Sequence, residues 1–181
     1  MDRKEALDLI KSNVGNKNLI KHMLATESCM RSLARYLGEN EERWGITGLL
    51  HDLDYDQTAQ EFSKHGFVSA DILKNKGVDE RIIYAIKAHP GHVDRKSPLD
   101  KSLYAVDPLT GLIVASALMH PDKKLSSLDT EFILRRFKEK RFAAGVNREQ
   151  IKSCDEIGLS LDEFIKICLE GMQSISEELG L

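Results

Sequence analysis

The sequence predicts an all-α fold, and three features of the 181-residue chain support that prediction. Apolar residues recur at spacings of three and four along most of the chain, which is the period of an amphipathic helix. Segments in which β-branched and polar residues alternate, as in a half-buried strand, are missing. Helix-start residues and glycine or proline stops bracket the apolar segments. Because a chain of this length can bury a sizeable core, we expect one domain over residues 1–181.

The first two predicted helices begin at asparagine caps and cover about 16–37 and 40–52. A glycine stops the first helix, whose inner face carries His22 among apolar residues. Two glutamates follow the second asparagine and suit the positive end of a helix dipole. This second helix contains His51 and Asp52 near its C-terminal end, inside an apolar run. An ionised carboxylate there would be costly without a partner.

Two shorter helices follow, over about 63–75 and 79–89. The first should carry His65 in its opening turn, on the side that faces the apolar layer. The second has an aspartate cap, is ended by a proline and closes on His89. Both histidines are therefore predicted to point toward the core.

A long apolar helix is predicted to start at Ser97, which is followed by a proline and an acidic third residue. Its inner face includes a single carboxylate, Asp107. Pro108 beside it should free a backbone carbonyl and bend the helix. The last third of the chain is also predicted to be helical, with starts at Asn147 and Ser160.

Charge and cysteine content exclude several classes of function. Lys and Arg total 26 against 29 Asp and Glu, so no positive field draws the chain to nucleic acid or to an anionic membrane. The three cysteines are far apart and form no Cys-x-x-Cys pair, which is typical of reduced packing residues. No run of 18 apolar residues occurs. We therefore expect a cytoplasmic protein with neither nucleic acid nor a membrane as partner.

Polar residues that are predicted to be buried come from five predicted helices and from none in the last third of the chain. Imidazole and carboxylate groups that converge in this way suit Fe, Mn, Zn, Ni or Co, whereas Ca or Mg favours an all-oxygen shell. The sequence thus predicts a divalent transition-metal site with one or two ions, and Mg is the less suitable ion. The six candidate residues are His22, His51, Asp52, His65, His89 and Asp107.

The order His, His-Asp, Asp resembles the HD-domain superfamily of metal-dependent phosphohydrolases, of the HDIG type. His22 opens a helix of small and apolar residues, and the His-Asp pair closes the run LLHD at 49–52. Asp107 lies in the segment YAVDPLTGL, which is similar to the family's last metal-binding element. The resemblance covers about residues 18–120 and leaves a C-terminal helical extension over about 121–181.

The resemblance implies both ligand roles and a reaction. Asp52 would bridge the metals or hold the catalytic water, and metal-activated water would cleave a phosphate ester or anhydride. Asp54 or Asp56 could accept a hydrogen bond from a metal-binding residue without binding the metal itself, although an acidic residue in a loop is more often solvated. His92 is an alternative to His89. The implied ligands are His22, His51, Asp52 and Asp107 for a first ion, and Asp52, His65 and His89 for a second.

One departure concerns the substrate. Relatives that cleave cyclic dinucleotides carry Gly-Lys after the pair, whereas Asp54-Tyr55 follows Leu53 here. Arg31, Lys64 or Lys87 could meet phosphate, but an exposed helical position explains each of them as well. The resemblance implies a small phosphorylated metabolite, and a nucleotide is the leading class.

The extension carries no ligand candidate. A basic run at 135–141 could border an anionic substrate or could be a solvated helix face. The helices there could cover the core or form a homodimer contact. Two further functions stay open: a non-catalytic helical module that keeps the metal site for structure or regulation, and a purely structural histidine core.

Overall fold

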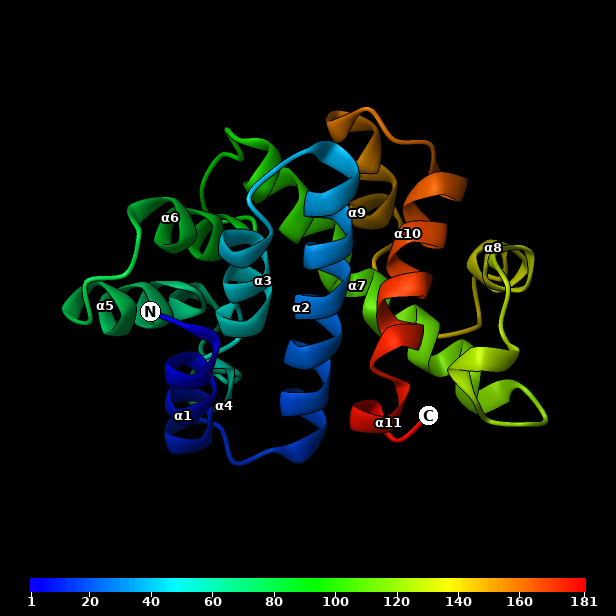
Figure 1. The fold of residues 1–181 in the computed structure, drawn as a ribbon, viewed down its shortest axis with the longest axis horizontal. Helices are drawn as coiled ribbons and strands as arrows, with labels where there is room; N and C mark the ends of the chain where they lie inside the picture. Colours follow the sequence, from blue (N-terminus) through cyan, green and yellow to red (C-terminus); the bar gives the residue numbers. More distant parts are fainter.

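The computed structural model describes residues 1–181 and contains helices but no strand, which confirms the all-α prediction. Figure 1 shows α2 standing between two groups of helices. Helices α1, α3, α5 and α6 lie on one side of it, and α8 to α10 lie on the other, with α7 passing behind. The helices are α1 Arg3–Asn13, α2 Lys17–Leu37, α3 Glu41–Leu50, α4 Tyr55–Thr58, α5 Phe67–Asn75, α6 Glu80–Ala88, α7 Pro98–Met119, α8 Thr130–Lys138, α9 Arg148–Lys152, α10 Leu161–Ser174 and α11 Ser176–Leu179, with single 3-10 turns at Phe62–Lys64, Leu125–Ser127 and Ser153–Ile157.

The core consists of two apolar clusters that meet along α2. Met23 of α2 packs in the cluster formed with α1, α3, α5 and α6. Cys29, two turns further on, packs in the cluster formed with α7 and the C-terminal helices. All three cysteines are buried and free, as the sequence predicted. Since α2 belongs to both clusters, its side chains fix the position of one half of the core relative to the other.

Most predicted helix starts are confirmed by side-chain caps. In each case the capping side chain accepts a hydrogen bond from a backbone N–H of the first turn, which would otherwise lack a partner. The left-handed Gly38 ends α2. The confirmed caps are Asn16, Asn40, Asp79, Ser97, Asn147 and Ser160.

Two predicted boundaries were wrong, and both lie beside the candidate ligands. The helix expected over 63–75 begins only at Phe67, because His65 is extended (ψ 134°) and Gly66 is left-handed (φ 80°). His65 therefore lies before the helix and not in its first turn. The helix expected to contain Asp52 ends at Leu50, so that Asp52 lies in the following turn.

Pro108 lies inside α7, which continues past it as one helix. Because proline has no N–H, the carbonyl of Tyr104 one turn earlier loses its usual partner. The side-chain amide of Gln150 in α9 donates to this carbonyl at 2.8 Å. By length and composition α7 could cross a membrane, yet 56% of its most apolar window is buried, which is the packing of a core helix.

Gly48 allows α3 to approach α2 closely. A Cβ atom at this position would lie 2.8 Å from the backbone oxygen of Thr26, a contact that a rigid helix cannot relieve. We expect Gly48→Ala to lower the free energy of unfolding by about 1–3 kcal/mol in urea titrations, because α2 and α3 must separate. The control is Gly111→Ala in α7, whose Cβ would meet only a methyl group at 4.0 Å. Equal stability of the two variants would contradict the close-approach explanation.

Candidate metal centre

The structure brings the six predicted residues into one cluster with Asp52 at its middle. One oxygen of Asp52, Oδ2, lies 3.5 Å from His22 Nε2 and 3.4 Å from His51 Nε2. The other oxygen, Oδ1, lies 3.2 Å from His65 Nε2 and 3.4 Å from His89 Nε2. Asp52 thus faces one histidine pair with each of its two oxygens.

Asp107 joins the first of these pairs. Its Oδ1 lies 3.2 Å from His22 Nε2 and 3.8 Å from His51 Nε2. Donor atoms of these three residues all lie within 4.8 Å of one another, which is close enough to hold a metal ion. The cluster therefore has two lobes that share Asp52.

Two of the histidines are held by the ends of helices. His51 follows the last residue of α3 and His89 follows the last residue of α6. The last carbonyls of a helix lack intrahelical partners. His51 Nδ1–H donates to the Gly48 carbonyl at 2.8 Å, and His89 Nδ1–H donates to the Ile86 carbonyl at 2.6 Å. Both rings are thereby locked, and the negative ends of two helix dipoles face the cluster.

His65 is held by a buried carboxylate. Its Nδ1–H donates to Asp54 Oδ1 at 2.8 Å. The other oxygen of Asp54 accepts from the backbone N–H groups of Gly66 at 2.9 Å and Ser69 at 2.8 Å. Asp54 is fully buried, so these bonds replace its hydration and fix the extended backbone of His65.

His22 is held by a hydroxyl group of α7. Thr110 Oγ1 donates to the Asp107 carbonyl at 3.0 Å, so its oxygen accepts from His22 Nδ1–H at 2.9 Å. All four imidazoles therefore direct an Nδ1–H group at an acceptor and turn Nε2 toward the cluster. A tautomer fixed in this way is typical of metal-binding histidines.

The distances between the Nε2 atoms require a cation in each lobe. His22 Nε2 lies 3.0 Å from His51 Nε2, and His89 Nε2 lies 3.1 Å from His65 Nε2. Two lone pairs at such separations repel each other unless a proton or a metal ion lies near them. The donor set of nitrogen and carboxylate ligands thus fits a divalent metal ion.

In the metal-free protein, a proton on one histidine of each pair relieves the repulsion between the two Nε2 lone pairs. Burial disfavours a charged His51, but Asp52 and Asp107 outweigh it and raise the His51 pKa to about 10. Burial likewise opposes the charge on His65, whereas Asp52 and Asp54 raise its pKa to about 9. Burial lowers the pKa of His89. These shifts favour a proton on His51 in the first lobe and on His65 in the second.

Metal binding is expected to release these protons. Because a metal needs the Nε2 lone pairs, two divalent ions should displace about two protons per protein at pH 7, from His51 and His65. Affinity should therefore rise with pH up to the pKa of each histidine. Calorimetric titration of the metal-free protein with Mn²⁺ in buffers of different ionisation enthalpy counts the protons. No proton release at pH 7 would contradict this account of the cluster.

The remaining sequence candidates lie outside the cluster. His92 Nε2 donates to the Phe62 carbonyl at 2.9 Å, so the structure places His89 and not His92 with the other histidines. Asp56 accepts from the backbone N–H of Gly15 at 2.8 Å. Lys64 pairs with Glu61 at 2.8 Å. Lys87 lies beside the ring of Tyr84, and in the basic run Arg135 and Arg136 pair with Glu131 and Glu139.

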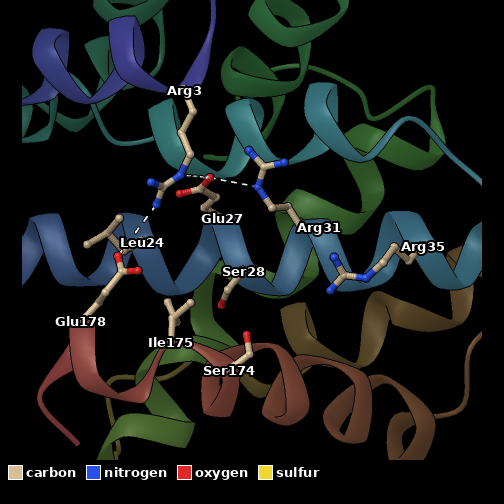
Figure 2. A pocket seen from close by; sticks show the side chains of 9 residues that line it. All are labelled: Arg3, Leu24, Glu27, Ser28, Arg31, Arg35, Ser174, Ile175 and Glu178. Carbon is tan, nitrogen blue, oxygen red and sulfur yellow. Dashed lines mark hydrogen bonds and ion pairs between the residues drawn. The ribbon is translucent and has the colours of Figure 1, made fainter.

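Arg31 lines a separate pocket of about 260 Å³ on the opposite face of α2 from His22. Figure 2 shows Arg3 and Arg31 converging there on Glu27. Both guanidinium Nε–H groups donate to the same Glu27 oxygen, at 2.7 and 2.9 Å. Arg3 also pairs with Glu178, and Arg31 also pairs with Glu42. The third arginine of the pocket, Arg35, pairs with Glu41, so each of these positive charges already has a carboxylate partner.

Sequence reasoning missed the groups that orient the ligands. Helical spacing placed Thr110 on the same face as Asp107, three residues earlier, without assigning it a role. Ser69 acts through its backbone N–H, which a side-chain pattern does not reveal. The carbonyls of Gly48 and Ile86 each lie three residues before a histidine that closes a helix. A histidine at a helix end was the available signal for these bonds.

The residues of the cluster lie within a segment that matches a known protein family. The family model for the HD domain matches residues 19–117, which is more than half of the chain. The chain belongs to the HD domain family. The HD domain defines a superfamily of metal-dependent phosphohydrolases, and HD domains bind divalent metals. The HD-domain match ends before the C-terminal helices α8 to α11.

The relatives differ in how much of each chain is shared. Ribonuclease Y of Oleidesulfovibrio alaskensis is 33% identical over 96 residues, covering 53% of this chain and 18% of that protein. Ribonuclease Y 2 of Levilactobacillus brevis is 30% identical over 95 residues, 52% of this chain and 18% of that protein. An uncharacterized protein of Methanocaldococcus jannaschii, MJ0778, is 26% identical over 161 residues, 84% of this chain and 92% of its own. No solved structure is a significant match.

Proposed function

We propose that the protein is a metal-dependent phosphohydrolase that cleaves a phosphate ester or anhydride of a small nucleotide. In this proposal Asp52 would be shared between the sites of two divalent ions. His22, His51 and Asp107 complete the site of the first ion, and His65 and His89 that of the second. The observation that carries it is the pair of short Nε2–Nε2 contacts, one facing each oxygen of Asp52. Fe, Mn, Zn, Ni or Co suits these ligands better than Mg.

The side chains of the cluster differ in exposure, which indicates where a substrate would enter. The Asp107 side chain is 30% exposed and that of His22 is 23% exposed. The His51 and His89 side chains are at most 1% exposed. Phosphate would therefore approach between Asp107 and His22, while the buried histidines exclude bulk water from behind.

The bound ions would neutralise phosphate oxygens and lower the pKa of a water molecule that attacks phosphorus. Asp52 would accept a hydrogen bond from that water and orient it, since both of its oxygens face the cluster. Asp107, on the open side, would keep the first ion near the substrate. Because imidazole ligands are neutral, they would not cancel the positive charge of the bound ions, and that charge would remain available to attract an anionic substrate.

A phosphodiester bond in RNA is the second candidate, because two of the relatives are named ribonuclease Y. The net charge of −3 supports a small nucleotide instead, since a polyanion is attracted by a basic surface. The net charge is thus the observation that favours a small nucleotide over RNA.

The test is chromatographic product analysis, together with phosphate release, on a panel of nucleoside mono-, di- and triphosphates, dinucleotides and a short RNA, with Mn²⁺, Co²⁺ or Zn²⁺ added. We expect turnover of at least one nucleotide, loss of that turnover in His51→Ala, and its retention in His92→Ala. Bound metal without turnover of any substrate would contradict the proposal and favour a non-catalytic metal-binding module. Cleavage of RNA alone would favour the second candidate.

A further inference from the structure

A groove of about 480 Å³ begins at the candidate metal centre. Its inner end is lined by His22 and by Thr110, the residue that orients His22. From there it runs between α2 and α7 and ends under residues 179–181. The volume lies within the range of small-molecule pockets. The groove thus adjoins the proposed phosphate site at His22 and is large enough for the rest of a substrate.

The side of the groove formed by α7 is apolar and partly flat. Val114 and Leu118 follow Gly111 at helical spacing, so the three line one face of α7. A Cβ at Gly111 would come no closer than 4.0 Å to its nearest neighbour, a methyl of Val146. The missing side chain therefore leaves open space, in which a planar ring can lie against the helix backbone.

Polar groups lie at the edge of the groove formed by α2. Asn18 and Lys21 both line it, on the same face of the helix as His22. Lys21 Nζ donates to the Leu179 carbonyl at 2.7 Å, which holds residues 179–181 over the outer end of the groove. An ammonium group has three donors, so Lys21 can also meet an acceptor on a ligand.

We propose that this groove binds the nucleoside part of the substrate, with the base between the two helices and the phosphate at the metal centre. This assignment rests on the proposed function and specifies its substrate class. An apolar wall with a few hydrogen-bonding groups at its edge suits a heteroaromatic base, whose faces are apolar and whose rim carries acceptors. The extension beyond the family match thus contributes residues 179–181 to specificity.

Binding of adenosine 5′-monophosphate and of inorganic phosphate to the Mn²⁺-loaded protein tests the assignment by calorimetry. We expect the nucleotide to bind at least about tenfold more tightly than phosphate. Gly111→Leu should fill the groove and remove that advantage while phosphate binding stays unchanged. The control is Gly145→Leu, an exposed position at which a Cβ meets nothing within 4 Å and which does not line the groove.

A second readout does not depend on metal or turnover. Adenosine added to the metal-free, isotope-labelled protein should shift the amide resonances of Gly111 and Gly180, and Gly111→Leu should abolish the shift of Gly180. Nucleotide and phosphate of equal affinity, or a nucleotide advantage that survives in Gly111→Leu, would overturn the assignment. Tighter binding of decyl phosphate than of the nucleotide would overturn it in favour of an aliphatic substrate. Loss of phosphate binding together with intact adenosine shifts would count against the proposed function and not against the groove.

Discussion

Asp52→Asn is expected to lower phosphate hydrolysis by on the order of 10³-fold or more, because metal-based stabilisation of a transition state is worth several kcal/mol. The asparagine keeps the shape of the side chain but replaces one carboxylate oxygen with an NH₂ group. Each oxygen of Asp52 now faces a pair of Nε2 atoms at 3.2–3.5 Å, so either orientation of the amide points a donor at one pair. Both lobes then lose the shared negative charge, and the lobe that faces the NH₂ group also loses its oxygen ligand.

The readouts for Asp52→Asn are the turnover number and the metal content per protein. Turnover should disappear and metal content should fall to one ion or fewer, while circular dichroism shows an unchanged helical fold. Asp56→Asn is the matched control, since this carboxylate binds the backbone of Gly15 and takes no part in the cluster. Turnover of Asp52→Asn within a few-fold of the unchanged protein would show that Asp52 is not the bridging ligand.

Asp54→Asn is expected to weaken binding of the second ion by about 10–100-fold, the range typical of groups that orient a metal-binding histidine. Asp54 accepts from His65 Nδ1–H and from the two N–H groups of Gly66 and Ser69. An asparagine has only one acceptor oxygen, so its NH₂ group must face a donor. Either His65 loses the partner that fixes its tautomer, or the backbone at Gly66 loses its anchor.

Two measurements separate this positioning role from general destabilisation. Competition with a chelator should show a weaker second ion and an unchanged first ion. Nitrogen NMR of the imidazoles should show a change in the tautomer of His65 and none in that of His51, whose Nδ1 binds a carbonyl of α3. Equal loss of both ions would mean that Asp54 acts only on stability.

Local signals in the sequence were sufficient to predict where most of the helices begin. Side-chain caps such as Asn16 and Ser160 act within one turn, so the residues themselves fix where those helices begin. The segment before α5 could not be placed in this way. His65 is extended because Asp54, eleven residues earlier, accepts from His65 and from the Gly66 N–H, which is a long-range contact that no helical period encodes.

In the candidate site, too, features set by spacing along the chain could be predicted, whereas features set by long-range contacts could not. The spacing of His22, the His-Asp pair and Asp107 is a property of the chain, and the family match agrees with it. That these residues bind metal stays a prediction. The choice between His89 and His92 depended on which ring the fold turns inward, and Pro90 lies between them. The role of Lys21 could not be predicted, because it arises from a contact with Leu179 across the whole length of the chain.

A crystal structure of the protein grown with Mn²⁺, with anomalous diffraction data, tests the central claim most directly. We predict two anomalous peaks, one facing each oxygen of Asp52. His22, His51 and Asp107 should lie around the first peak, and His65 and His89 around the second. A single peak bound by only one histidine pair would contradict the bridging role of Asp52. No peak in the cluster at saturating Mn²⁺ would contradict the metal centre itself.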